Sequence, residues 1–142
     1  MELTVKVMVV EDNDIVAQAI EAFLLINRHQ VMGPYSTSAD VFRAVQHERP
    51  DLVLMDIDLH GRSSGLDCAR VLFKRYNIPV VFLSSDVTAA RTGELVAVGA
   101  LAKPVTGDTL LASLHAVEQI VEGKMPRHVP PAFTLYQQPG YH

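Results

Sequence analysis

The sequence has almost no cysteine, no excess of positive charge and no long apolar run. Cys68 is the single cysteine among 142 residues, which excludes an intrachain disulfide framework and a cysteine-based zinc site. Lysine and arginine number 12 against 16 acidic residues, so no broad nucleic-acid-binding surface is expected. No segment has the ~20 apolar residues of a membrane span, and the start MELTVKVMVVED lacks a signal-peptide pattern. We expect a cytoplasmic protein that binds neither membrane nor nucleic acid.

The residues that are present indicate one globular α/β domain. Hydrophobic residues make up 49% and charged residues 20% of the chain, which is typical of a folded protein. Apolar, β-branched runs predict strands at 4–10, 30–35, 51–56, 79–84 and 99–103. Helical spacing of apolar residues predicts helices after residue 13, after residue 38, and over about 66–76, 87–98 and 106–121. This alternation predicts a mostly parallel five-stranded sheet with helices on both faces.

Two stretches qualify this pattern. Gly33-Pro34 lies within the second predicted strand and places it at a sheet edge, because proline donates no ladder hydrogen bond. From Gly123 onward the chain holds four of its eight prolines and no acidic residue. We therefore divide the chain into a domain at 1–122 and a proline-rich tail at 123–142, with disorder as the default for the tail. Docking of its aromatic residues on the domain or on a partner is the alternative; these are Phe133, Tyr136 and Tyr141.

Polar side chains follow four of the predicted strands at their carboxyl ends, where open α/β sheets carry their sites. These residues are Glu11, Asp12, Asp56, Ser84 and Lys103. Three carboxylates together favour a hard cation, and Mg²⁺ takes oxygen ligands of this kind. With the metal held by Asp12 and Asp56, Asp56 can also act as a nucleophile toward phosphorus. The metal, the Lys103 ammonium and the Ser84 hydroxyl would then each neutralise one phosphoryl oxygen.

The order and approximate spacing of these residues resemble the receiver domain of a two-component response regulator. The match consists of Glu11-Asp12, Asp56 at the end of DLVLMD, Ser84 after PVVFL, and Lys103-Pro104, over about residues 4–122. The resemblance implies a flavodoxin-like (βα)5 fold with strand order 2-1-3-4-5 and a cis Lys103–Pro104 peptide. It also implies that Asp56 accepts a phosphoryl group from a sensor histidine kinase, a phosphotransfer protein or a small phosphodonor.

The resemblance assigns further roles near the acceptor. The backbone carbonyl of Asp58 would be the third protein ligand of Mg²⁺, and Glu11 would orient metal-bound water. The side chains of Asp58 and Asp86 occupy positions that modulate how long the phosphoryl group survives, and two acids there predict slow or atypical self-dephosphorylation. Considered one at a time, these residues also have simpler structural interpretations. Asp12 is a candidate helix cap, and Lys103 is a candidate surface lysine. Ser84 is a candidate cap of the fourth helix, as are Ser85 and Asp86.

The sequence departs from the family pattern in three places. His60 stands where a proline is usual, and a solvent-exposed loop histidine is its simplest interpretation. Only nineteen positions separate Ser84 from Lys103, fewer than is typical, which predicts a shortened fourth helix or loop. Ala100 replaces the aromatic residue that is usual three positions before the lysine, so signal output through that face is expected to be atypical. No output domain is recognisable within the tail.

We therefore predict a stand-alone response regulator that acts as a phosphate shuttle or sink, or binds a downstream protein in one phosphorylation state. It is a regulatory domain rather than an enzyme, because Asp56 is modified and regenerated on the chain itself. Homodimerisation through the last helix stays open, since Leu111, Ala112 and His115 widen its apolar stripe. Two alternatives are a pseudo-receiver dimerisation scaffold and a flavodoxin-like cofactor-binding module, although the acidic EDNDIV loop disfavours bare phosphate.

Overall fold

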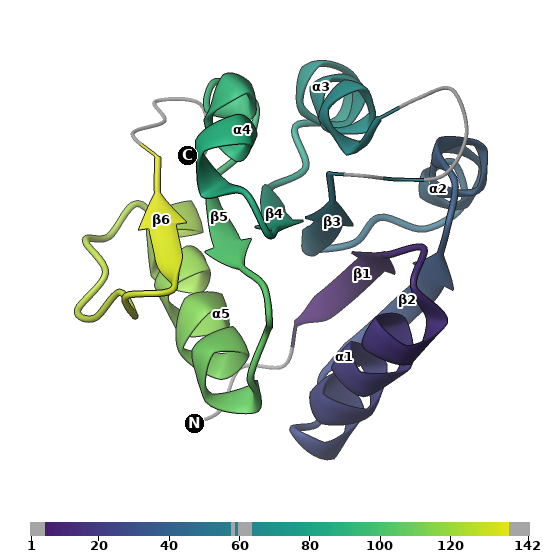
Figure 1. Cartoon of the computed structure of the whole chain (residues 1–142). Helices are drawn as coiled ribbons and strands as arrows, with labels where there is room; N and C mark the ends of the chain where they lie inside the picture. Colours follow the sequence, from purple (N-terminus) through teal and green to yellow (C-terminus); the bar gives the residue numbers. More distant parts are fainter. Residues whose placement is uncertain (1–4, 58, 60–63, 137–142) are drawn as a thin grey trace.

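The computed structural model describes residues 5–57, 59 and 64–136 (Figure 1). Its strands are β1 (Lys6–Val10), β2 (Gln30–Tyr35), β3 (Leu52–Asp56), β4 (Val80–Ser84), β5 (Gly99–Ala102) and β6 (Phe133–Leu135). Its helices are α1 (Asp14–Ile26), α2 (Ser38–Val45), α3 (Gly65–Tyr76), α4 (Val87–Ala90), the 3-10 turn η1 (Arg91–Gly93) and α5 (Gly107–Val121). The sheet order is β2-β1-β3-β4-β5-β6, and the first five strands are parallel. The predicted α/β fold and the order 2-1-3-4-5 are confirmed, with β2 at an edge.

The sheet is the middle of three layers because its strands are apolar on both faces. In β1, Val7 and Val9 point toward one face, whereas Met8 and Val10 point toward the other. Helices α1 and α5 cover the Val7 face, and α2, α3 and α4 cover the Met8 face (Figure 1). All of β3 and β4 is buried. Two hydrophobic cores, one on each face, therefore hold the carboxyl ends of β1, β3, β4 and β5 at a common edge.

Side-chain caps fix where the helices begin. Asn13 accepts a hydrogen bond from the Val16 amide at 3.1 Å, so Asn13 rather than Asp12 or Asp14 caps α1. Thr106 caps α5 in a reciprocal arrangement with Thr109. Such caps satisfy amide groups that the first helical turn leaves unpaired. Asp12 is thereby left to point into the edge of the sheet rather than along the helix.

The fourth helix is much shorter than the apolar spacing over 87–98 predicts. Helix α4 ends at Ala90, and only the turn η1 follows before the chain reaches β5. At Gly93, the last residue of η1, a Cβ atom would lie 2.6 Å from the Phe82 ring, so only glycine fits here. The chain therefore approaches β4 closely at this point. The shortening expected from the small Ser84–Lys103 spacing is confirmed.

Part of the predicted tail is an ordered strand. Helix α5 ends at Val121, Gly123 just beyond it has φ +81°, and the chain then returns to pair β6 antiparallel with β5. Disorder was therefore the wrong expectation for residues 133–136, because Phe133 and Tyr136 are both buried against the domain. Tyr141 lies outside the described residues. The division of the chain at residue 122 stays a prediction.

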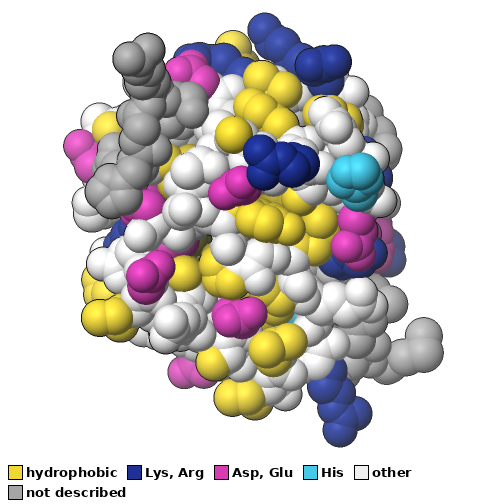
Figure 2. All heavy atoms as spheres, turned by 90° about the vertical axis from the view of Figure 1, so that its right-hand side faces the viewer, with side chains coloured by type: hydrophobic (Ala, Val, Ile, Leu, Met, Phe, Trp, Pro, Cys, Tyr) yellow, Lys and Arg dark blue, Asp and Glu magenta, His cyan; other side chains and the backbone are white. Residues whose placement is uncertain are grey.

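The surface is mixed in character. On the face shown in Figure 2, acidic and basic side chains are interspersed, and hydrophobic side chains reach the surface in several separate groups. Among the described residues, no helix combines the length and the apolar composition that crossing a membrane requires.

Candidate functional site

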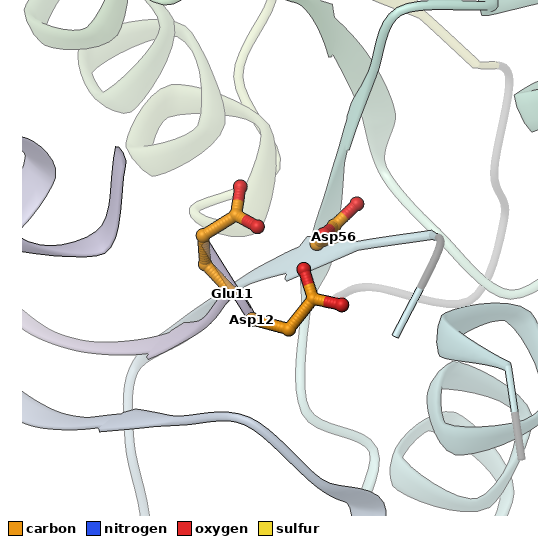
Figure 3. A group of neighbouring side chains, drawn as sticks. All are labelled: Glu11, Asp12 and Asp56. Carbon is orange, nitrogen blue, oxygen red and sulfur yellow. The ribbon is translucent and has the colours of Figure 1, made fainter. Parts of the chain in front are cut away.

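Three carboxylates meet at the carboxyl edge of the sheet. Strand β1 pairs with β3 so that Val10 lies opposite Met55, which places Glu11 and Asp56 on neighbouring strand ends. Asp12 follows from the loop into α1. One oxygen from each of Glu11, Asp12 and Asp56 lies within 4.8 Å of the others (Figure 3). The sequence prediction that these side chains gather in one place is supported by this geometry.

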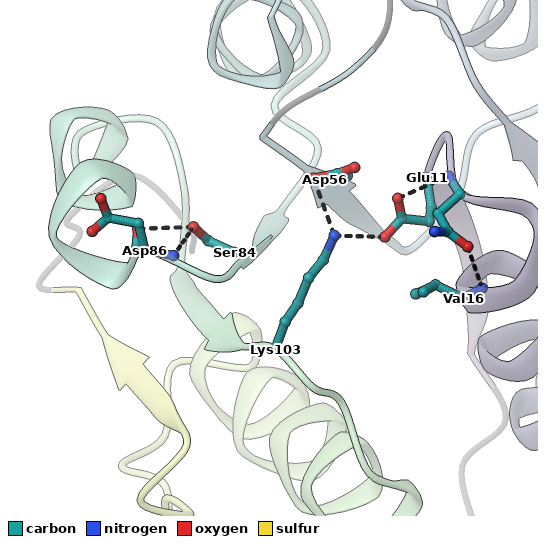
Figure 4. Close-up of polar contacts among 7 residues, drawn as sticks. Glu11, Val16, Asp56, Ser84, Asp86 and Lys103 are labelled. Atoms are coloured by element: carbon teal, nitrogen blue, oxygen red, sulfur yellow. Dashed lines mark hydrogen bonds and ion pairs between the residues drawn. The ribbon is translucent and has the colours of Figure 1, made fainter.

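Lys103 joins this cluster from the end of β5. Its Nζ atom lies 2.8 Å from Glu11 Oε1 and 3.3 Å from Asp56 Oδ1 (Figure 4). The peptide bond to Pro104 is cis, as the resemblance implied. Burial acts to lower the pKa of Lys103, but its hydrogen bond to Glu11 and the charges of Asp56 and Glu11 outweigh it, so this pKa is raised. Lys103 is therefore a cation held between two buried carboxylates.

Glu11 takes a more direct part in the site than the sequence indicated. Its side chain is only 1% exposed, and its second oxygen accepts a hydrogen bond from the Asn13 amide at 3.2 Å. Burial acts to raise the pKa of Glu11, but hydrogen bonds to Asp56, Lys103 and Asn13 outweigh it, so the pKa lies below its usual value. The direct Glu11–Lys103 ion pair was not predicted, because no sequence pattern specifies which carboxylate a lysine will reach. The predicted role of Glu11 in orienting metal-bound water stays a prediction.

Ser84 is buried at the end of β4, but its hydrogen bonds lead away from the carboxylates (Figure 4). Its Oγ atom donates to the Asp86 carbonyl at 2.8 Å and accepts from the Asp86 amide at 2.9 Å. The Asp86 side chain caps α4 by accepting from the Ala89 amide. Of the candidates Ser84, Ser85 and Asp86, it is therefore Asp86 that caps the fourth helix. The influence of Asp86 on the lifetime of the phosphoryl group stays a prediction. Asp58 and His60 lie outside the described residues.

The family follows from comparison of the whole chain with known proteins. The family model of the response regulator receiver domain matches residues 7–115. The chain belongs to the response regulator receiver family. Receiver domains are the regulatory, phosphorylation-controlled modules of two-component signal transduction, and this assignment agrees with the site residues named from the sequence.

The similar proteins include a longer regulator and a separately solved receiver domain. The phyllosphere-induced regulator PhyR of Methylorubrum extorquens is 32% identical over 94 residues, which are 66% of this chain and 35% of PhyR. The chain thus spans about a third of that relative's length. The receiver domain of a modulated diguanylate cyclase from Desulfovibrio desulfuricans G20 has a TM-score of 0.71 and 32% identity, covering 79% of this chain and 91% of that one.

A second solved structure shares the fold at lower identity. It is the receiver domain of the sensor histidine kinase PA1611 from Pseudomonas aeruginosa, which carries a magnesium ion in its active-site cleft. Its TM-score is 0.70 at 23% identity, covering 80% of this chain and 96% of that one.

Proposed function

We propose that this receiver domain accepts a phosphoryl group on Asp56 from a phosphohistidine, in a Mg²⁺-dependent step, and signals or relays through that modification. The observation that carries the proposal is the position of Asp56. Its carboxylate ends a fully buried strand, lies 3.3 Å from the Lys103 ammonium and shares an acidic cluster with Glu11 and Asp12. A buried carboxylate needs partners of this kind, and phosphoryl transfer needs the same charges.

The donor set fits Mg²⁺ rather than a softer metal. Asp12 and Asp56 would hold the ion, with the Asp58 carbonyl as a third ligand, and no histidine or cysteine belongs to the described acidic cluster. Bound there, Mg²⁺ would offset negative charge on the phosphoryl oxygens. Glu11 adds carboxylate charge beside these ligands, while its ion pair with Lys103 keeps the ammonium directed at Asp56.

The chain's own residues account for the transfer. An Asp56 carboxylate oxygen forms a bond to phosphorus as the bond from phosphorus to the donor's imidazole nitrogen breaks, and the imidazole leaves with that electron pair. Lys103 offers an ammonium to a phosphoryl oxygen, and Ser84 offers a hydroxyl once it turns from Asp86. Hydrolysis later returns Asp56 to its carboxylate form. The chain is then a regulator whose only chemistry is on itself.

The donor is inferred to dock a helix against α1. Four residues line the exposed side of this helix at spacings of four, three and four positions: Ile15, Ala19, Ala22 and Ile26. Ile15 and Ile26 are 81% and 78% exposed. Beside them a groove of about 600 Å³ runs between α1 and α5, and Lys103 is among its lining residues. An apolar helix surface that leads to the acceptor fits a helical donor carrying phosphohistidine.

Incubation with acetyl phosphate and Mg²⁺ tests the acceptor, read on Phos-tag gels and by intact mass. Wild-type chain should gain one phosphoryl group, and Asp56→Asn should gain none. Asp67→Asn is the matched control, because Asp67 is an exposed acid in α3 whose side chain pairs with Arg70 and whose amide donates to the Ser64 cap. Equal phosphorylation of Asp56→Asn and wild type would contradict the proposal.

A second pair of variants tests donor docking. Ala19→Arg places charge in the exposed apolar stripe, whereas Gln46→Arg places the same charge after α2, on an exposed site of the other layer. Phosphorylation of wild type and of each variant is measured with acetyl phosphate and with a panel of autophosphorylated sensor kinases. Ala19→Arg should lose at least tenfold in transfer from any kinase that phosphorylates wild type, with acetyl phosphate unaffected. Unchanged kinase transfer would refute docking at α1.

A further inference from the structure

The segment from residue 130 to 136, here called the strap, covers the outer edge of β5 (Figure 1). The Ala102 amide donates to the Ala132 carbonyl, and the Tyr136 amide donates to the Val98 carbonyl, both at 2.9 Å. The strand within the strap, β6, has only three residues. A short antiparallel edge strand is a weakly held element compared with the buried strands beside it. The strap is therefore an ordered but separable part of the domain.

Tyr136 anchors the end of the strap on the α4 side of the sheet. Its side chain belongs to the same hydrophobic cluster as Ala90, Ala97 and Ala100, and the guanidinium carbon of Arg91 lies 5.7 Å from its ring centroid. Its hydroxyl is buried and, among the described residues, has no hydrogen-bond partner. Burial of an unpartnered hydroxyl is unfavourable. The docked strap thus buries an unsatisfied hydroxyl, while the Tyr136 ring packs in the cluster that includes Ala90 of α4 and lies beside Arg91 of η1, a surface called here the α4–η1 wall.

That wall connects the strap to the acceptor site. Ser84 donates its single hydroxyl proton to the Asp86 carbonyl, and Asp86 caps α4. A hydroxyl has one proton to donate, so Ser84 can bond a phosphoryl oxygen on Asp56 only by leaving the Asp86 carbonyl. Helix α4 has just four residues, so a change at its N-cap Asp86 affects a large part of its hydrogen bonding. Ala90, the last residue of α4, belongs to the same hydrophobic cluster as Tyr136, and Arg91, the first residue of η1, lies over the Tyr136 ring.

We propose that phosphorylation of Asp56 releases the strap and uncovers the β5 edge as a binding site for an extended segment of a partner protein. This rests on the proposed function of Asp56. The strap itself indicates what the site accepts: a segment that pairs antiparallel with β5 and buries large apolar side chains on both sides, as Phe133 and Tyr136 do. In the unphosphorylated chain the strap occupies this site in place of the partner.

Two substitutions distant from the carboxylates bias the strap in opposite directions. At Gly99, an added Cβ would lie 2.4 Å from the Thr134 carbonyl oxygen and 2.7 Å from the Phe133 ring, so Gly99→Ala opposes docking of the strap. The nearest atoms to that Cβ all belong to the strap. Tyr136→Phe removes the unpartnered hydroxyl and keeps the ring, so it favours docking. Neither changes a residue of the phosphorylation site.

Hydrogen–deuterium exchange of the full chain tests the proposal, with and without acetyl phosphate and Mg²⁺, and with intact mass recorded on each sample. Phosphorylation should speed exchange of the 133–136 amides at least tenfold and open Phe133 and Tyr136 to chymotrypsin. Gly99→Ala should show fast exchange without phosphate, and Tyr136→Phe should show slower exchange than wild type in the phosphorylated state. By reciprocity, Gly99→Ala should also reach a higher phosphorylated fraction at limiting donor.

The outcomes separate the two proposals. Asp56→Asn treated in the same way should show no change in exchange, which supports the link to Asp56. A chain that gains phosphate on Asp56 while the 133–136 amides exchange at the same rate, or more slowly, overturns the strap proposal alone. A chain that gains no phosphate refutes the proposed function and the strap proposal with it. Should Gly99→Ala fail to fold, the Tyr136→Phe comparison still decides.

Discussion

Replacing Lys103 by methionine should destabilise the domain by leaving two buried carboxylates without their cation. At an effective dielectric constant of ~20, the attractions at 2.8 Å and 3.3 Å are each about 5–6 kcal/mol before desolvation. The carboxylates that remain, Glu11 and Asp56, have oxygens within 4.8 Å, a repulsion of at least about 3.5 kcal/mol on the same scale. Because the lysine side chain is 25% exposed, solvent screens part of this, and we expect a net loss of about 2–4 kcal/mol at pH 7.

The pH dependence follows from the same charges. In the wild type the pKa of Glu11 is lowered, so its contribution to stability is present above the unfolded pKa and is lost as pH falls through the folded pKa. In Lys103→Met the facing carboxylates should have raised pKa values, so protonation at low pH relieves the variant. The difference between wild type and variant should therefore shrink as pH falls from 7 toward 4. Mg²⁺ at ~10 mM should stabilise the variant more than the wild type, since no ammonium competes for the carboxylates.

Urea unfolding followed by circular dichroism, at pH 7 and pH 4 with and without Mg²⁺, measures all three effects. Lys124→Met is the matched control, because Lys124 pairs with Glu122 at 3.2 Å but both side chains are exposed, and a change within ~0.5 kcal/mol is expected. A Lys103→Met variant as stable as wild type at pH 7, or one whose deficit persists unchanged at pH 4 and in Mg²⁺, would refute this reasoning.

Three further predictions concern other parts of the fold. Thr106→Ala should lower the free energy of unfolding by about 1 kcal/mol through loss of the α5 cap, as measured by urea unfolding, whereas Thr106→Ser should be near neutral. Gly65→Ala should impair phosphorylation by acetyl phosphate, because a Cβ there would lie 2.1 Å from the Asp56 carbonyl oxygen; normal phosphorylation would exclude a tight contact. Burial raises the pKa of Cys68 to about 11, so alkylation by iodoacetamide at pH 8 should be at least ~100-fold slower in the native chain than in urea, and equal rates would contradict its burial.

Strand order and the position of the acceptor were predictable because they depend on local patterns. Buried parallel strands read as continuous apolar runs, and the polar residues that end them must meet at one sheet edge. The strap was missed because a three-residue strand among prolines has too little periodicity to separate it from a coil. Its docking depends on Gly99, more than thirty positions away, where an added Cβ atom would clash with the strap.

The site was predictable in its members but not in its pairings. Asp12, Asp56 and Lys103 follow from strand ends, whereas the Glu11–Lys103 ion pair and the orientation of Ser84 toward Asp86 depend on side-chain conformations set by the folded chain. The fourth helix shows the same limit. Apolar spacing favoured a helix through Val98, whereas α4 ends at Ala90 and the chain turns through η1 to pack Gly93 closely against Phe82, a tertiary contact that periodicity does not encode.

Neither edge strand of the sheet favours aggregation by pairing with a strand of another chain. At one margin β2 contains Pro34, which donates no amide to a neighbouring chain, and at the other β6 offers only three residues. If β6 moved away, the next exposed margin would be β5, whose sequence GALA is small-sided and contains one glycine. Such a strand has little side-chain surface for self-association, so the protein can expose this margin briefly without forming intermolecular sheets.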